Sequence, residues 1–136
     1  MRKRTQAREY ALQLLYAYDI TQDELKDLEP FWAQADEVIP EIKDFTEKLF
    51  LGTLKNLERI DKKISGFADN WQLKRMAAVD RNILRMGSFE LSYLEDVPAK
   101  VTINEAVDLA KKYSGEEAGK FVNGILDRIR ADLGKN

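Results

Sequence analysis

The chain of 136 residues contains no cysteine and no histidine. Their absence removes disulfide bonds, the common zinc sites, thiol nucleophiles and acid–base catalysis by histidine. A catalyst built only from carboxylates, lysine, serine or tyrosine would remain, but most active sites depend on the missing residue types. The sequence therefore predicts a protein that is not an enzyme, with no catalytic residues, no metal site and no cofactor.

Long hydrophobic runs are also missing, since the longest apolar stretches have four or five residues. A membrane-spanning helix needs about 20. The basic N-terminus is not followed by the apolar segment of a secretory signal. We therefore expect no membrane association and, by default, a cytoplasmic location. Hydrophobic content of 44% and charged content of 34% are those of an ordinary globular protein.

No segment alternates for long between apolar and polar residues, whereas helical spacing recurs along the chain. It predicts an all-α fold of about seven helices in a single domain, 1–136, with an N-terminal bundle over about 5–64 and a C-terminal bundle over about 70–134. Pro40 begins one predicted helix that runs to about residue 64, after which Ser65-Gly66 and Asp69-Asn70 interrupt the pattern. The first helix carries the clearest apolar stripe, formed by Ala7, Tyr10, Ala11, Leu14, Leu15 and Tyr18.

Two local motifs predict where the last helices begin. Thr102 and Glu105 have the spacing of a capping box, in which each side chain binds the other's backbone N–H. Ser114 and Glu117 repeat this spacing, and Gly115 between them suits a left-handed helix end.

The stretch "KFVNGILDRI" at 120–129 places Asn123-Gly124, a typical turn pair, inside a helical apolar pattern. A glycine in a helix interior costs about 1 kcal/mol relative to alanine. We expect a continuous helix in which Gly124 lets a neighbouring backbone approach closely and Asn123 binds an adjacent loop.

The net charge is −2, but Arg2, Lys3, Arg4 and Arg8 all precede the first acidic residue, Glu9. Cations at the start of a helix oppose its dipole, so this cluster suggests contact with an anion such as a phosphate backbone. A solvated terminus is the alternative. Three tyrosines follow on the same helix: Tyr10 and Tyr18 fall on the apolar stripe, whereas Tyr16 lies off it and should be exposed.

Four segments together resemble the NusB family of bacterial transcription antitermination factors. They are "RTQAREYALQLLY" at 4–16, "DRNILRMGSFEL" at 80–91, "PAKVTINEAVDLAKKY" at 98–113 and "KFVNGILD" at 120–127. The resemblance implies two three-helix bundles and a non-enzymatic adaptor. Its partners would be single-stranded boxA RNA, the ribosomal protein NusE, and the RNA polymerase antitermination complex with other Nus factors, notably on rRNA operons.

The resemblance also implies functional residues. The RNA-binding start of the family corresponds to Arg2, Lys3, Arg4 and Arg8. A second RNA-facing region corresponds to Glu117, Lys120 and Phe121 at the start of the last helix. NusE would contact Tyr16 and Asp80.

Two other functions stay open at this point. The chain could be a protein-interaction bundle whose basic cluster does not bind RNA, or a regulatory domain that assists an rRNA-modifying enzyme. The sequence also leaves open whether the free protein is a monomer or a homodimer.

Overall fold

The computed structural model describes residues 2–23, 25–68 and 70–136, and in these ranges it contains eight α-helices and no β-strand. The all-α prediction is confirmed, with one helix more than the seven expected. The helices are α1 (Lys3–Thr21), α2 (Glu29–Gln34), α3 (Pro40–Lys55), α4 (Leu57–Ser65), α5 (Asn70–Arg75), α6 (Ala78–Tyr93), α7 (Ala99–Ser114) and α8 (Glu116–Asp132).

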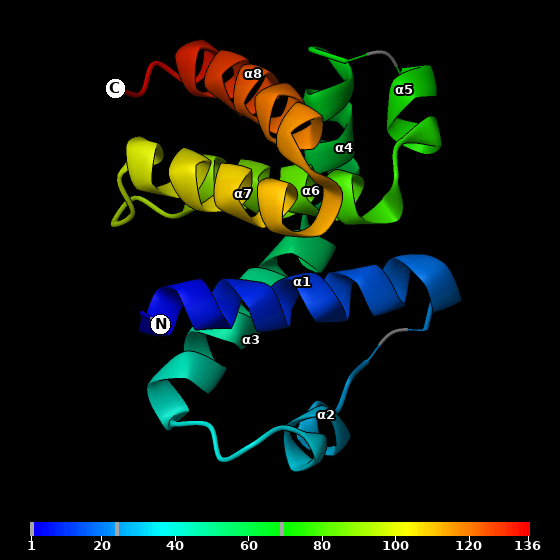
Figure 1. The fold of residues 1–136 in the computed structure, drawn as a ribbon, viewed down its shortest axis with the longest axis vertical. Coiled ribbons are helices and arrows are strands. Elements are labelled where there is room, and N and C mark those ends of the chain that lie inside the picture. Colours follow the sequence, from blue (N-terminus) through cyan, green and yellow to red (C-terminus); the bar gives the residue numbers. More distant parts are fainter. Residues whose placement is uncertain (1, 24, 69) are drawn as a thin grey trace.

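The helices form two groups that meet along α1 and α6 (Figure 1). In the lower part of the view α1 packs against α3, with α2 below them; in the upper part α6, α7 and α8 pack together with α4 and α5. Helix α6 contacts α1, α3, α4, α7 and α8. This central position explains why every residue from Asn82 to Leu91 is buried, since a helix covered on all sides has no solvated face.

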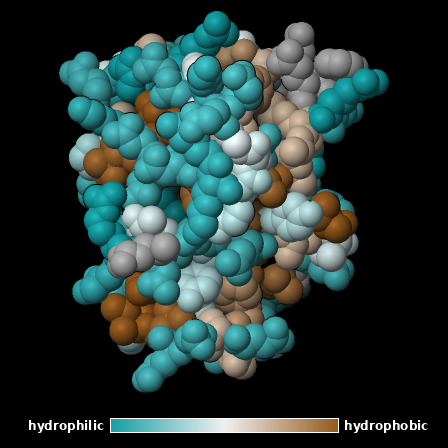
Figure 2. Space-filling view, viewed as in Figure 1, coloured by the Kyte–Doolittle hydropathy of each residue, from teal (hydrophilic) through white to brown (hydrophobic). Residues whose placement is uncertain are grey.

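The apolar stripe predicted for the first helix is confirmed. Ala7, Ala11, Leu14 and Leu15 are fully or almost fully buried in α1, and Tyr10 and Tyr18 pack partly buried against the same core. Most of the face shown in Figure 2 is hydrophilic, with small separate apolar areas.

The single helix predicted over 40–64 is divided at Asn56 into α3 and α4. The backbone N–H and the side-chain Nδ2 of Asn56 both donate to the carbonyl oxygen of Gly52, at 3.2 and 2.8 Å. Helix α4 packs against α5, α6 and α8 as well as α3, so the chain changes group at Asn56. Of the predicted interruption at Asp69-Asn70, Asp69 lies outside the described residues and Asn70 begins α5, a helix that the sequence pattern did not predict.

The predicted capping box of Thr102 and Glu105 is wrong. Helix α7 begins three residues earlier, at Ala99. Both side chains bind other helices: the Thr102 hydroxyl donates to Glu90 at 3.1 Å, and Glu105 accepts from the Thr5 hydroxyl at 2.5 Å. Tertiary partners have replaced the local ones.

The second predicted capping box is also wrong, because Ser114 ends α7 and the start of α8 has no side-chain cap. Gly115 lies between the two helices with φ 106°. The positive φ agrees with the predicted left-handed helix end, but ψ of −179° lies outside the left-handed helical region. A glycine adopts this conformation readily, and it lets α8 begin directly after α7. Within the described ranges, no helix combines the length and apolar character needed to cross a membrane.

Candidate nucleic-acid interface

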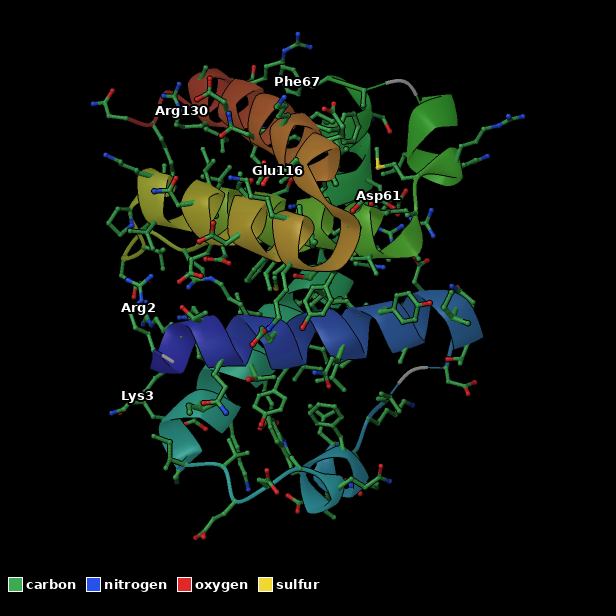
Figure 3. The ribbon with its side chains drawn as sticks, in the orientation of Figure 1. Arg2, Lys3, Asp61, Phe67, Glu116 and Arg130 are labelled. Atoms are coloured by element: carbon green, nitrogen blue, oxygen red, sulfur yellow. The ribbon has the colours of Figure 1, made fainter. Side chains whose placement is uncertain are left out.

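Three of the four cations predicted to bind RNA lie exposed at the beginning of α1. Arg2 precedes the helix, and Lys3 and Arg4 form its first two residues. Figure 3 shows Arg2 on the side of α7 and Lys3 on the side of α3. The helix start has neither a side-chain cap nor an acidic residue in its first turn. We call the three cations, Arg2, Lys3 and Arg4, the basic arm. Together with the unsatisfied backbone N–H groups of the helix start, the basic arm attracts an anion.

Although no acidic residue precedes these cations in the sequence, the fold brings acidic residues close to them. Acidic residues from other parts of the fold lie within 3.4 Å of each one: the pairs are Arg2–Glu105, Lys3–Glu41 and Arg4–Asp96. The cation side chains are still more than half exposed. The Lys3–Glu41 and Arg4–Asp96 pairs are exposed on both sides, and such pairs are weak enough for a phosphate group to displace them. The carboxylate of Glu105, which pairs with Arg2, is largely buried.

Arg8 is not exposed, and only 2% of its side chain meets solvent. Its Nε and Nη2 atoms donate to the two carboxylate oxygens of Glu90 at 2.9 and 2.6 Å, and Nη1 lies 3.4 Å from Glu105. Burial alone would lower the Arg8 pKa, but the hydrogen bond and charge of Glu90, with the charge of Glu105, raise it overall. The prediction that Arg8 faces RNA therefore needs correction: in this structure its guanidinium joins α1 to α6 and α7.

The second predicted RNA-facing region lies on the first two turns of α8. Glu117 and Lys120 are strongly exposed and form a surface pair at 3.7 Å, while Phe121 is 37% exposed. Lys120 and Phe121, but not Glu117, line an open hollow of about 540 Å³. We call it the α8 hollow; its other lining residues are Ser65, Gly66, Phe67, Ala68, Gly124, Ile125 and Arg128.

Gly124 does not have the packing role expected for it. A side-chain carbon placed at Gly124 would meet nothing within 4 Å, and Asn123 beside it is exposed. The close approaches occur elsewhere, at Gly52 against the Phe89 ring and at Gly87 against Leu126. The helical part of the prediction is confirmed, because α8 continues through Gly124.

The two predicted partner-binding residues lie near each other. Tyr16 is 43% exposed, as expected, and lines a shallow hollow of about 240 Å³ with Val79 of α6. Asp80 follows Val79 in the first turn of α6, and its Oδ1 atom is buried without a hydrogen-bond partner among the described residues. We call the hollow beside Tyr16 the α1–α6 hollow. Its other lining residues, besides Val79, are Glu9, Leu12, Gln13 and Tyr113, and Asp80 lies next to it in the chain without lining it.

Sequence reasoning missed Tyr113, whose exposed ring stands at the edge of the α1–α6 hollow. Its hydroxyl donates to Glu9 at 2.9 Å, and Lys112 binds the same carboxylate oxygen at 2.5 Å. Partial burial, followed by the hydrogen bond to Glu9, raises the Tyr113 pKa. Tyr113 lies almost 100 residues from Tyr16 in the chain, so no local pattern could have paired them.

Asp19 fixes the end of α1 against α6 beside the α1–α6 hollow. Its Oδ2 atom accepts from Arg81 at 2.6 and 2.9 Å and from Asn82 at 3.0 Å, and Oδ1 lies 3.4 Å from Arg85. Burial alone would raise the Asp19 pKa, but these hydrogen bonds and charges lower it. The network therefore holds the last turn of α1 against the first turns of α6.

These surfaces offer cations, aromatic rings and an apolar hollow, which are groups for binding. Among the described residues, no group of histidine, cysteine, aspartate or glutamate side chains is arranged to hold a metal ion. In the part of the chain that the structure describes, the fold is therefore an all-α protein whose surface features are suited to binding.

Comparison with known proteins identifies the family. Residues 5–131 match the model of the NusB family. The transcription antitermination protein NusB of Thermodesulfovibrio yellowstonii is 44% identical, over 93% of this chain and 91% of its own length. A structure of T. maritima NusB has a TM-score of 0.84 and 38% identity, covering 97% of this chain and 92% of its own.

A crystal structure of antitermination factors NusB and NusE in complex with dsRNA is also similar. Its matching chain has a TM-score of 0.88 and 32% identity, covering 97% of this chain and 98% of its own. The chain belongs to the NusB family, whose members are transcription antitermination factors and not enzymes.

Proposed function

We propose that this protein is an RNA-binding adaptor that acts in transcription antitermination in the cytoplasm. It binds single-stranded boxA RNA together with NusE, notably on rRNA operons, and joins the RNA polymerase complex with other Nus factors. The observation that carries the proposal is the basic arm: Arg2, Lys3 and Arg4 are exposed at an uncapped helix start. The similar structure of NusB and NusE with dsRNA supports both partner classes.

The arm is suited to the phosphate backbone because its three charges are exposed and two of them are held only in weak surface pairs. Phosphate contacts supply affinity without reading sequence, and three cations contact only a few phosphates. Binding by this protein alone should therefore be weak and strongly dependent on salt. Tight, specific binding requires the additional contacts of a partner protein.

A salt titration of RNA binding tests the role of the arm. Replacing Arg2, Lys3 and Arg4 together with alanine should reduce the slope of log affinity against log salt by about 0.7 for each phosphate that the arm neutralises. The matched control replaces three exposed lysines elsewhere, Lys26, Lys55 and Lys74, which removes the same charge. If both triple variants bind boxA-like RNA alike, the arm is only a solvated terminus.

We place NusE on the α1–α6 hollow, against Tyr16 and Asp80. Tyrosine is a residue type enriched at interface hot spots, and the Asp80 carboxylate can pair with an arginine or lysine of a basic ribosomal protein. The apolar hollow beside Tyr16 suits an aliphatic side chain of the partner. The alternative to a role of Asp80 in binding NusE is a purely structural one, because an acidic residue in the first turn of a helix stabilises that helix by a few tenths of a kcal/mol.

A further inference from the structure

Gly124 lies in the middle of α8 without a structural reason for being glycine. Its position is exposed, a side chain there would meet no atom within 4 Å, and its φ is not in the left-handed region. Glycine is nevertheless unfavourable inside a helix. The explanation must therefore lie in what the open surface above Gly124 contacts.

That surface is part of the α8 hollow. Phe121 and Arg128 stand three residues before and four residues after Gly124, so the three lie in a row along one face of α8. Ser65, the last residue of α4, and residues 66–68 after it also line this hollow. Any side chain at position 124 would project into the space between Phe121 and Arg128.

We propose that the α8 hollow holds one nucleotide of single-stranded RNA, with Gly124 keeping the space open. The base would lie against the exposed Phe121 ring, and Lys120 and Arg128 would contact its phosphates. This inference rests on the proposed function and extends it to a defined subsite and to two residues, Gly124 and Arg128.

The chemistry of the hollow favours a nucleotide over a protein segment. An exposed aromatic ring that lines the same hollow as two cations matches a base joined to a phosphate, and base–aromatic stacking works with any base. Arg128 forms no ion pair among the described residues, and Lys120 pairs only with the exposed Glu117, at 3.7 Å. By contrast, the α1–α6 hollow contains no cation: two tyrosines, a leucine and a valine line it together with Glu9 and Gln13, which suits a side chain of a partner protein better than a phosphate.

The α8 hollow and the basic arm lie in different parts of the molecule. Figure 3 shows Phe67, at the end of α4, near the top of the view, whereas Arg2 and Lys3 lie at the start of α1 in the other helix group. One RNA strand reaches both places only if it is long enough to cross α7 and α8. The subsite should therefore strengthen binding of a complete boxA-like strand more than binding of a very short oligonucleotide.

The variant Gly124→Leu tests the proposal, with Asn123→Leu as its matched control. Asn123 is exposed on the same helix but does not line the hollow. Gly124→Leu should raise the melting temperature, because leucine is a better helix former than glycine. It should also lower the affinity for a boxA-like single strand by about tenfold, within the range measured for one stacked base. Asn123→Leu should leave RNA affinity unchanged.

A second variant, Arg128→Gln, should reduce the salt slope by about 0.7 without affecting stability. The proposal is overturned if Gly124→Leu binds RNA as tightly as the unaltered protein, or if it lowers the melting temperature, which would reveal a packed site. If Gly124→Leu leaves RNA affinity unchanged but replacement of the basic arm reduces the salt dependence of RNA binding, the subsite proposal fails while the proposed RNA-binding function stands. If neither the arm nor Gly124 variants alter RNA binding, both proposals fail.

Discussion

Replacing Arg8 with methionine should destabilise the protein strongly rather than weaken RNA binding directly. Arg8 and Glu90 are each 2% exposed and share two hydrogen bonds, at 2.6 and 2.9 Å. Glu90 also accepts from Thr102, and Arg8 reaches Glu105, so the network joins α1, α6 and α7. Removing one member of a buried pair leaves the other charge uncompensated, which typically costs about 3–5 kcal/mol.

The free energy of unfolding, measured by urea denaturation, gives the magnitude. Arg8→Met should lower it by about 3 kcal/mol or more. The double variant Arg8→Met with Glu90→Met should recover part of that stability, because apolar residues can replace a buried ion pair with little cost. Arg4→Met, which removes an exposed cation four residues earlier on α1, serves as the control and should change stability little.

Two results would refute this reasoning. The first is a decrease below about 1 kcal/mol for Arg8→Met, the range of an exposed pair. The second is unchanged stability together with a reduced salt slope for RNA binding, which would mean that Arg8 contacts phosphate directly.

Two further predictions concern acidic residues, and Asp36, an exposed acid away from both hollows, serves as control for each. The lowered pKa of Asp19 stabilises the fold above the unfolded-state pKa of about 3.9, and this contribution disappears as the pH falls through the lower folded-state pKa. Asp19→Asn should therefore lower the free energy of unfolding near neutral pH more than Asp36→Asn, by a difference that shrinks below about pH 4; a pH-independent difference would contradict it. Asp80→Lys should weaken NusE binding about tenfold in calorimetry with little change in melting temperature, unlike Asp36→Lys; equal affinities would place NusE elsewhere.

The sequence predicts the helices well where burial follows a single period. The stripe of α1 depends only on spacing, and the structure reproduces it with Tyr16 outside and Tyr10 partly inside. The division between α3 and α4 was missed because both helices are apolar on the side that faces the core. The break at Asn56, where the backbone and the side chain both bind the Gly52 carbonyl oxygen, changes the direction of the chain, and a change of direction is not encoded in periodicity.

Local motifs failed where distant residues compete for the same side chains. Thr102 and Glu105 have capping spacing but bind Glu90 and Thr5 instead, because a buried hydroxyl or carboxylate requires a partner wherever one is available. For the same reason, the charge pattern located the basic arm but not the burial of Arg8. Acidic residues 82 and 97 positions away neutralise it.

The surroundings of a glycine also depend on residues that are distant in the sequence. Gly52 and Gly124 both lie in helical apolar patterns, yet a side-chain carbon at Gly52 would collide with the Phe89 ring, whereas one at Gly124 would meet nothing within 4 Å. The α8 hollow was beyond sequence analysis because one side comes from Ser65–Ala68, a segment far from α8 in the chain. The row of Phe121, Gly124 and Arg128 on one helical face was the available signal.

We propose above all that RNA and NusE bind this protein together. Titration of a boxA-like single strand, with and without saturating NusE, tests it most directly. We predict weak, salt-dependent binding alone and tighter binding with NusE. RNA must then tighten NusE binding by the same factor, because coupling between two ligands is reciprocal. An RNA affinity that is the same with and without NusE would contradict the account.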